Sequence, residues 1–307
     1  MFGNLGPGSI PWLFIDEAGQ AVPQAAAGAL WRCKRAVVVG DPFQIEPVVT
    51  TPDAIIKELG NHFDLKWEQM DSTLSVQRMA DRVNRYGWTM NDDWVGSPLR
   101  VHRRCTDPMF SIANEIAYAG MMYNSTPSAS TKLLMETAFV DVRGNVEAGC
   151  RHYVTAQGEV IRKMILDEID RQQALPDLFV ISPFSEIPSK LRSELEKPLK
   201  AAVANLPQQM NDKKVNDWLD THIGTVHTFQ GKQAEGVILC LGLDSTKEGA
   251  AQWAASKPNL LNVALTRAKL RFVAVGDGQI WLGKPYFREL ESLKQVQAGC
   301  DTDPKRV

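Results

Sequence analysis

The chain has 307 residues, of which 44% are hydrophobic and 23% are charged, values typical of a globular protein. They exclude a disordered, collagen-like or disulfide-stabilised chain. The 34 Lys and Arg residues nearly balance the 36 Asp and Glu residues, so an anionic partner must be bound through local basic patches. The apolar run 237–243 is far shorter than the ~20 residues of a membrane-spanning helix, so we expect no membrane partner.

Two features of the sequence, its cysteines and its first residues, indicate the cellular compartment of the protein. The 5 cysteines are odd in number, widely spaced and without a C-x-x-C pair. This pattern indicates reduced thiols and argues against a zinc site. The first residues lack the basic segment followed by an apolar segment that a secretory signal has. We therefore expect a cytoplasmic protein.

Short apolar runs alternate along the chain with segments of helical periodicity. Near-continuous apolar strands are typical of a parallel sheet covered on both faces, and alternation of strand and helix predicts a doubly wound α/β fold. Polar segments at 91–98 and 124–132 indicate loops, and 299–307 indicates a frayed tail. The predicted strands are 12–15, 36–39, 139–142, 178–181, 223–226, 236–241 and 272–275, and the predicted helices are 22–31, 106–118, 155–173, 185–203 and 259–268.

Two adjacent carboxylates, Asp16 and Glu17, follow the first predicted strand. Ligands of parallel α/β sheets lie beyond the carboxyl ends of the strands, so both acids would face a ligand. Such a pair suits nucleotide hydrolysis, in which one carboxylate holds Mg²⁺ and the other orients or deprotonates the attacking water. An acidic N-terminal cap of a helix explains the same residues equally well.

A second polar segment, Gly40–Glu46, follows the next predicted strand. Its neutral Gln44 could hydrogen-bond both a terminal phosphate and the attacking water. An ordinary Gly-Asp-Pro turn that ends a strand is the alternative.

Six segments in order resemble the motifs of superfamily 1 helicases, in particular the 5′-to-3′ branch that contains the helicase of nonsense-mediated mRNA decay. D-E-A-G-Q at 16–20 and G-D-P-F-Q-I at 40–45 resemble motifs II and III. The later segments are L-R-V-H-R-R at 99–104, which resembles the start of the second RecA-like domain, F-V-I-S-P-F at 179–184, G-T-V-H-T-F-Q-G-K at 224–232, which resembles motif V, and N-V-A-L-T-R-A-K at 262–269, which resembles motif VI.

The resemblance implies an α/β, RecA-like P-loop NTPase fold, with parallel sheets flanked by helices and with one partial and one complete RecA-like domain. Residues 1–96 would form the partial first domain, residues 97–298 the second domain, and residues 299–307 a tail. The implied cofactors are ATP and Mg²⁺, and the implied partner is single-stranded DNA or RNA.

The resemblance also assigns catalytic roles. Asp16 would hold Mg²⁺, Glu17 would be the catalytic base, and Gln44 would sense the γ-phosphate. Arg104 and Arg267 would act as arginine fingers from the second domain, because a planar and permanently charged guanidinium neutralises phosphate charge in the transition state. A solvated basic turn and a surface helix cation are the alternatives for these two arginines.

The binding residues implied by the resemblance lie in two motifs. Gly231, Lys232 and Gln233 would contact the nucleotide, with Gln233 at a ribose position where the family usually has Glu. The residues implied to contact the nucleic acid are Ser182, Pro183, Thr225 and His227. An N-terminal helix cap is an equally good explanation for Ser182.

A phosphate-binding loop of the form G-x-x-x-x-G-K-[ST] does not occur in the 307 residues. The stretch before Trp12 has no room for that loop with its strand and helix. The chain therefore resembles the C-terminal motor region of an ATP-dependent helicase, which needs the N-terminal part of the same protein as a partner. By itself we expect it to be inactive in ATP hydrolysis. The alternative is a catalytically dead helicase-like module for nucleic-acid or protein binding.

Overall fold

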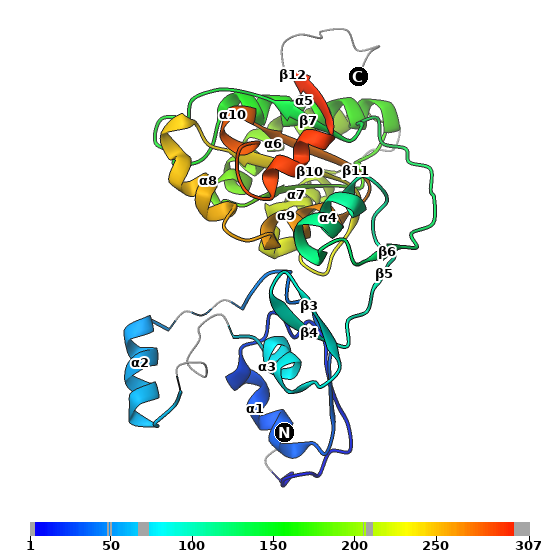
Figure 1. Ribbon diagram of the computed structural model, residues 1–307. Helices are drawn as coiled ribbons and strands as arrows, with labels where there is room; N and C mark the ends of the chain where they lie inside the picture. The colour runs from blue at the N-terminus through cyan, green and yellow to red at the C-terminus, as the bar shows by residue number, and fades with distance from the viewer. Residues whose placement is uncertain are drawn as a thin grey trace. The chain divides into compact units, whose positions relative to one another are not determined.

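The computed structural model describes residues 4–47, 49, 51–66, 74–204, 206 and 211–297. The chain divides into two compact units, Met1–Leu99 and Arg100–Val307, each of which is considered by itself (Figure 1). The tail predicted at 299–307 lies outside the described residues. The assignment of residues 1–96 and 97–298 to a first and a second RecA-like domain stays a prediction.

The first unit combines a pair of parallel strands with three described helices. Ile15 and Val38 are register partners in the strand pair, and backbone hydrogen bonds continue it beyond both strands, from Val39 N–H to the carbonyl of Ile15 and from Ala18 N–H to that of Val39. The elements are β1 (Leu13–Ile15), α1 (Pro23–Arg32), β2 (Ala36–Val38), α2 (Asp53–His62) and α3 (Val76–Val83).

The loop predicted at 91–98 is wrong, because residues 91–96 form the turn and the second strand of a β-hairpin. Strands β3 (Gly87–Met90) and β4 (Asp93–Gly96) pair antiparallel. The two residues between them, Asn91 and Asp92, both have positive φ angles of 48° and 67°. Asn and Asp tolerate this conformation, and it is the one that the favoured two-residue hairpin turn requires.

The second unit is built on a six-stranded sheet in which all neighbouring strands are parallel, in the order β12-β7-β11-β10-β8-β9. All six strands therefore end at the same edge. A short parallel pair of β5 (Val101–His102) and β6 (Tyr123–Asn124) precedes this sheet. The six strands are β7 (Ala138–Asp141), β8 (Leu178–Ser182), β9 (Ile223–Thr225), β10 (Ala234–Gly242), β11 (Ala268–Gly276) and β12 (Lys294–Gln297).

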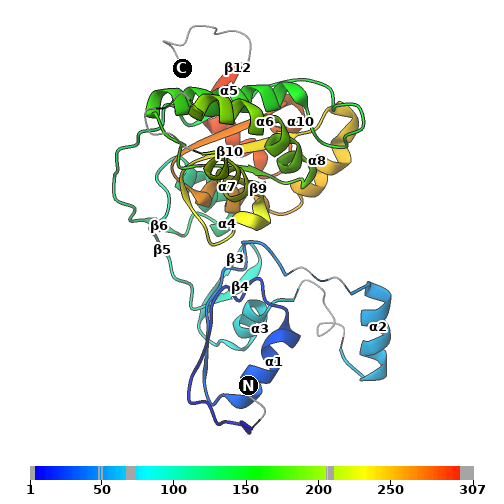
Figure 2. The ribbon, with the colours of Figure 1, turned by 180° about the vertical axis from the view of Figure 1, so that it is seen from behind.

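Helices cover both faces of this sheet (Figures 1 and 2). Helix α6 contacts both α5 and α7, and these three helices lie on one face, whereas α4 and α9 pack together on the other. The helices are α4 (Met109–Tyr118), α5 (Thr155–Gln172), α6 (Glu186–Ala204), α7 (Asp212–His222), α8 (Glu248–Ala254), α9 (Asn259–Arg267) and α10 (Gly278–Trp281), with 3₁₀ turns η2 (Val226–Phe229), η3 (Ser245–Lys247) and η4 (Phe287–Ser292).

The core of the second unit follows the apolar pattern of its strands. Every residue of β8 is buried, and β10 is buried from Gly236 to its end. Such strands are typical of a parallel sheet with helices on both faces. The predicted α/β class is thereby confirmed. No helix among the described residues is long and apolar enough to cross a membrane.

Candidate functional site

The two acidic candidates of the first unit lie directly after β1. The side chain of Asp16 is exposed and accepts a hydrogen bond from the backbone N–H of Glu17 at 2.9 Å. Glu17 has a positive φ of 52°, which costs energy for a residue other than glycine, and Gln20 Nε2 donates to its Oε2 at 3.0 Å. The backbone turn thus presents both carboxylates at the end of the strand.

Two glycines bring the acidic loop against the loop that follows β2. A Cβ atom on Gly40 would lie 2.7 Å from the backbone nitrogen of Gly19, and one on Gly19 would lie 2.8 Å from the carbonyl oxygen of Asp41. Neither loop tolerates a side chain at these positions. Both glycines lie inside the motifs that resemble motifs II and III, and their place in those motifs was the one signal in the sequence that could have identified them.

Helix α3, which was not predicted, supports the acidic loop after β1. The N–H of Gln77 donates to the carbonyl of Ala18 at 3.1 Å, and the N–H of Val76 donates to that of Ala21 at 2.9 Å. Ser75 caps the helix by accepting from the N–H of Arg78 at 3.1 Å. Serine before an amphipathic segment is a usual signal of a helix start, and it could have identified α3.

Gln44, the candidate phosphate sensor, is buried in the turn after β2. Its Nε2 donates to Asp41 Oδ2 at 2.9 Å, and the N–H of Phe43 donates to Asp41 Oδ1 at 2.9 Å. Asp41 therefore fixes both the turn and the amide of Gln44. The role of Gln44 toward a phosphate stays a prediction.

Arg267 of the second unit is almost completely buried, with 1% of its surface exposed. It lies in the last turn of α9, and its guanidinium bonds to the turn after η2. Its NH1 donates to the carbonyl of Lys232 at 3.0 Å and to that of Phe229 at 3.5 Å, and its Nε donates to the carbonyl of Val263 at 3.2 Å. The structure therefore joins motif VI to motif V through one side chain.

Arg104 is exposed and lies in the loop between β5 and α4, beside the buried thiol of Cys105. Burial, assisted by Asp107, raises the pKa of Cys105 to about 12, and the positive charges of Arg267 and Arg104 oppose this shift. Thr106 N–H donates to the carbonyl of Lys269 at 3.0 Å, which ties this loop to the start of β11. Arg104 and Arg267, far apart in the sequence, are thus both close enough to this thiol to act on its pKa.

The nucleotide-binding candidates Gly231, Lys232 and Gln233 are exposed and form the turn that Arg267 holds. Gly231 has a φ of 77°, a conformation that favours glycine. The ammonium of Lys232 lies 5.6 Å from the centre of the Phe229 ring. The structure brings these three residues together with Arg267, and their contact with a nucleotide stays a prediction.

The nucleic-acid candidates lie at the carboxyl edge of the sheet. Ser182 at the end of β8 and Thr225 at the end of β9 are register partners. Thr225 Oγ1 is 3.1 Å from Thr228 Oγ1, and His227 is exposed in η2. Ser182 and Pro183 are buried, and Ser182 Oγ accepts from the N–H of Phe184 at 3.3 Å, so the hydroxyl of Ser182 caps the turn before α6.

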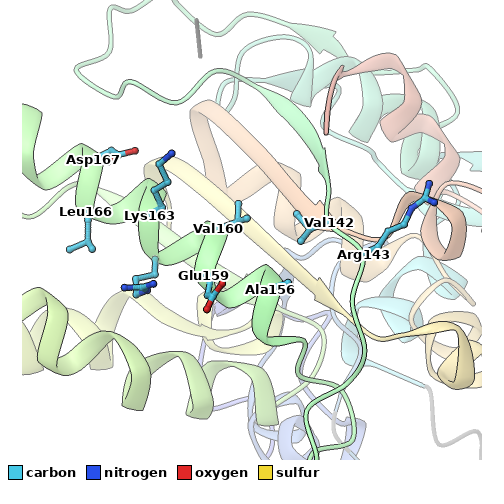
Figure 3. Close-up of a pocket in the computed structure, with 9 residues that line it drawn as sticks. Val142, Arg143, Ala156, Glu159, Val160, Lys163, Leu166 and Asp167 are labelled. Atoms are coloured by element: carbon cyan, nitrogen blue, oxygen red, sulfur yellow. The ribbon is translucent and has the colours of Figure 1, made fainter. Parts of the chain in front are cut away.

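A cavity of about 580 Å³ lies elsewhere on the second unit, along α5 and the end of β7 (Figure 3). Its charged lining is mixed, with Arg143, Arg162 and Lys163 against Glu159 and Asp167. None of the predicted site residues lines it. The cavity gives no support to the predicted chemistry.

Comparison with known proteins places the chain in a family. The AAA domain family matches residues 88–279, which is more than half of the chain. The chain belongs to this family. The matched segment includes every candidate residue of the second unit, from Arg104 to Arg267, whereas Asp16, Glu17 and Gln44 precede it.

Individual relatives are distant and much longer. The regulator of nonsense transcripts 1 homolog of Neurospora crassa is 21% identical over 283 residues, which are 87% of this chain and 22% of that protein. The DNA replication ATP-dependent helicase/nuclease DNA2 of Gallus gallus is 22% identical over 274 residues, 85% of this chain and 22% of that protein. The predicted kinship with superfamily 1 helicases is confirmed at this low identity, and the fold is RecA-like.

A solved structure of the C-terminal domain of a possible DNA helicase from Lactobacillus is also similar. It is 12% identical, has a TM-score of 0.38, and the similarity covers 64% of this chain and 98% of that chain.

Proposed function

We propose that this chain is the C-terminal motor region of an ATP-dependent helicase or translocase that moves on single-stranded DNA or RNA. The observation that carries the proposal is the junction of motifs V and VI, in which buried Arg267 binds the backbone of the turn 229–232. Motif V carries both Thr225, a proposed contact of the nucleic acid, and Gln233, a proposed contact of the nucleotide. A hydrogen bond from motif VI to this turn therefore supports coupling between nucleotide binding and nucleic-acid binding.

The proposed hydrolysis divides the chemistry between the residues of the two units. Glu17 accepts a proton from water as the water oxygen attacks the γ-phosphorus, the bond to the β–γ bridging oxygen breaks, and ADP and phosphate result. Gln44 orients the water, and Arg104 stabilises the negative charge that develops on the phosphates. Arg267 would do the same only if its guanidinium gave up its hydrogen bonds to carbonyl oxygens and bound phosphate oxygens in their place.

The donor set of the first unit fits Mg²⁺. This hard cation prefers carboxylate oxygens and retains several waters, and Asp16 offers an exposed carboxylate at the end of a parallel strand. When bound, the ion would supply charge neutralisation at the phosphates. Glu17 is bonded by Gln20 and lies in the same turn, so it is suited to a separate role as base.

ATP hydrolysis by the 307 residues alone is expected to be negligible. The G-x-x-x-x-G-K-[ST] loop, whose amides cradle the phosphates, does not occur in this sequence. We propose that another segment of the same protein supplies it. The same observation favours the second candidate function, a catalytically inactive module that binds nucleic acid or protein. The 5′-to-3′ direction of movement rests on branch resemblance alone, and the cytoplasmic location rests on cysteine usage.

An ATPase assay of the full-length gene product tests the proposal. We expect phosphate release that single-stranded DNA or RNA stimulates, and a loss of about 10²–10⁴-fold when Glu17 is replaced by Gln, because general base catalysis contributes about that much. Glu235→Gln is a matched control, since Glu235 bonds to the N–H of Lys132 and belongs to no predicted site. Full activity of Glu17→Gln would refute the assigned base, and absence of any ATPase in the full-length protein would favour the inactive module.

A further inference from the structure

Trp253 is an exception to the burial of large apolar side chains in the second unit. Among the described residues that follow Tyr123, it is the one large hydrophobic side chain that is exposed, with 57% of its surface accessible. The other described Trp residues of that unit, Trp218 and Trp281, are buried. An indole that the fold leaves open has a flat apolar face available for a ligand.

The position of Trp253 is fixed by the helix that carries it. Ala251 and Ala254 are the buried residues of α8 and anchor its inner face. The carbonyl of Trp253 accepts from the Oγ of Ser256 at 2.8 Å, which closes the end of the helix. The indole therefore projects from a supported backbone and not from a free loop.

Aromatic side chains lie beneath this indole. Its ring centre is 6.1 Å from that of buried Phe184 at an angle of 39°, and Phe184 stacks on His152 with centres 4.4 Å apart and an angle of 5°. Burial lowers the pKa of His152, with the charges of Arg151 and Lys247 acting in the same direction and Glu186 opposing them. The imidazole is therefore neutral at pH 7, and the cluster Trp253, Phe184 and His152 is an uncharged aromatic platform.

The platform lies next to the predicted strand contacts. Phe184 follows Ser182 and Pro183, and its N–H donates to the Oγ of Ser182. Ser182 is in turn the register partner of Thr225. The exposed indole is thus linked through Phe184 to the carboxyl ends of β8 and β9, where Thr225 offers a hydroxyl suited to phosphate oxygens.

Basic groups accompany the aromatic rings. Arg151 is exposed, and Arg151 and Lys247 are close enough to His152 to influence its protonation. The acid in the neighbourhood, Glu186, accepts from the backbone N–H groups of Arg151 at 2.9 Å and His152 at 2.7 Å, which partly compensates its charge. Aromatic faces combined with basic groups are the usual means of binding single strands without sequence preference.

We propose that Trp253 is a nucleobase-stacking residue, which holds one base of a single strand while Thr225 contacts its backbone. This inference rests on the proposed function, since it assigns a new residue to the same strand-binding surface. It predicts that the contact is indifferent to the identity of the base, because every base has a π-face.

Binding of fluorescent oligonucleotides to the full chain tests the inference. The probes are oligo(dT) and oligo(rU) of about 15 nucleotides, a length that exceeds most single-domain sites, and an abasic oligonucleotide of equal length and charge, all measured by anisotropy. We expect Trp253→Ala to weaken the binding of oligo(dT) and oligo(rU) by at least about five-fold and to leave the binding of the abasic probe unchanged. We expect Trp253→Phe, which keeps an aromatic ring, to retain most of the affinity of the parent.

Two further variants separate the possible failures. Trp31→Ala removes an indole of similar exposure, 56%, from the first unit and is expected to change nothing. Thr225→Ala is expected to weaken all probes, the abasic one included. If Thr225→Ala does so while Trp253→Ala has no effect, or weakens base-bearing and abasic probes equally, the stacking role is refuted and the strand-binding surface remains. If the unaltered chain binds no probe, the proposal that this chain binds single strands is refuted, and the stacking role is refuted with it.

Discussion

Both units contain apolar strands that pair in parallel, but their sheets differ in size. In the second unit six parallel strands lie between two layers of helices, and side chains such as Phe139 and Phe272 are completely buried. In the first unit β1 and β2 form a sheet of two strands, and apolar residues in and beside them stay open: Phe14 is 72% exposed, Trp12 50% and Val39 46%. The cluster packed against these two strands is built on the small buried residues Ala18, Ala26 and Val76.

This difference shows what an apolar strand pattern does and does not predict. An apolar pattern indicates that a strand can lie in a sheet with both faces buried. Whether its faces are in fact buried depends on the neighbouring strands and helices. A pair of strands with unpaired edges offers little cover, and exposed rings beside open edges favour association with other chains or segments. We therefore expect the first unit to be the less self-sufficient part of the chain.

The largest expected effect is on stability, from a pair of Phe→Ala substitutions. Phe272→Ala should lower the free energy of unfolding of the second unit by about 3–5 kcal/mol, because it leaves a cavity in a closely packed core. Phe14→Ala should change stability by no more than about 0.5 kcal/mol, since most of its ring is already exposed. Urea unfolding followed by circular dichroism measures both. A comparable loss for Phe14→Ala would mean that the face of β1 is covered in solution.

The sequence predicted the strands β1, β2 and β7 to β11 and the helices α1, α4, α5, α6 and α9, because their apolar spacing is clear. No prediction covered the helices α2, α3, α7, α8 and α10, of which α8 and α10 have only 7 and 4 residues. The strands β5 and β6 have 2 residues each, and β12 is mostly exposed, so none of the three shows a clear apolar run. The hairpin at 87–96 was missed because Gly, Asn and Asp residues resemble a linker until the positive φ angles of Asn91 and Asp92 are known.

The sequence was sufficient to predict which motifs form the candidate site, but not which contacts their side chains make. Motif order identified Arg267, but its complete burial and its bonds to the carbonyls of Phe229 and Lys232 depend on how α9 packs against the turn after η2. Likewise, the exposure of Trp253 follows from which face of α8 is buried. Neither property is encoded in the local spacing of residues.

The second expected effect separates the two candidate arginine fingers. Arg267→Gln should lower the stability of the second unit by about 2–3 kcal/mol, because charge-assisted hydrogen bonds are lost and carbonyl oxygens remain buried. Arg104→Gln should change it by no more than about 0.5 kcal/mol, because this side chain is exposed. Thermal unfolding measures the difference. In the full-length protein both substitutions, and also Arg267→Lys, should abolish ATP turnover. Near-normal turnover of Arg267→Lys would contradict its role as an arginine finger, whatever its effect on stability.

The smallest effect concerns the pH dependence of the first unit. Asp81 of α3 is buried, and burial raises the pKa of its carboxyl although the N–H of Gly96 and the Nε2 of Gln77 donate to its Oδ1. A pKa that is raised in the folded state means that the folded protein binds the proton more tightly than the unfolded chain does. The contribution of Asp81 to stability is therefore greatest below its ordinary pKa of 3.8 and falls as pH rises through the raised value.

Asp81→Asn removes this titration while it preserves the shape of the side chain and an oxygen that can accept from Gly96. Urea unfolding of both proteins between acid and neutral pH should show that the variant gains stability relative to the parent as pH rises, by about 1 kcal/mol or less at neutral pH. Asp107→Asn is the reference substitution, because the carboxyl of Asp107, which accepts from the hydroxyl of Ser111, is exposed and belongs to the second unit. A difference between Asp81→Asn and the parent that stays constant with pH would show that the Asp81 carboxyl is hydrated, and that the first unit is as open around α3 as it is around β1.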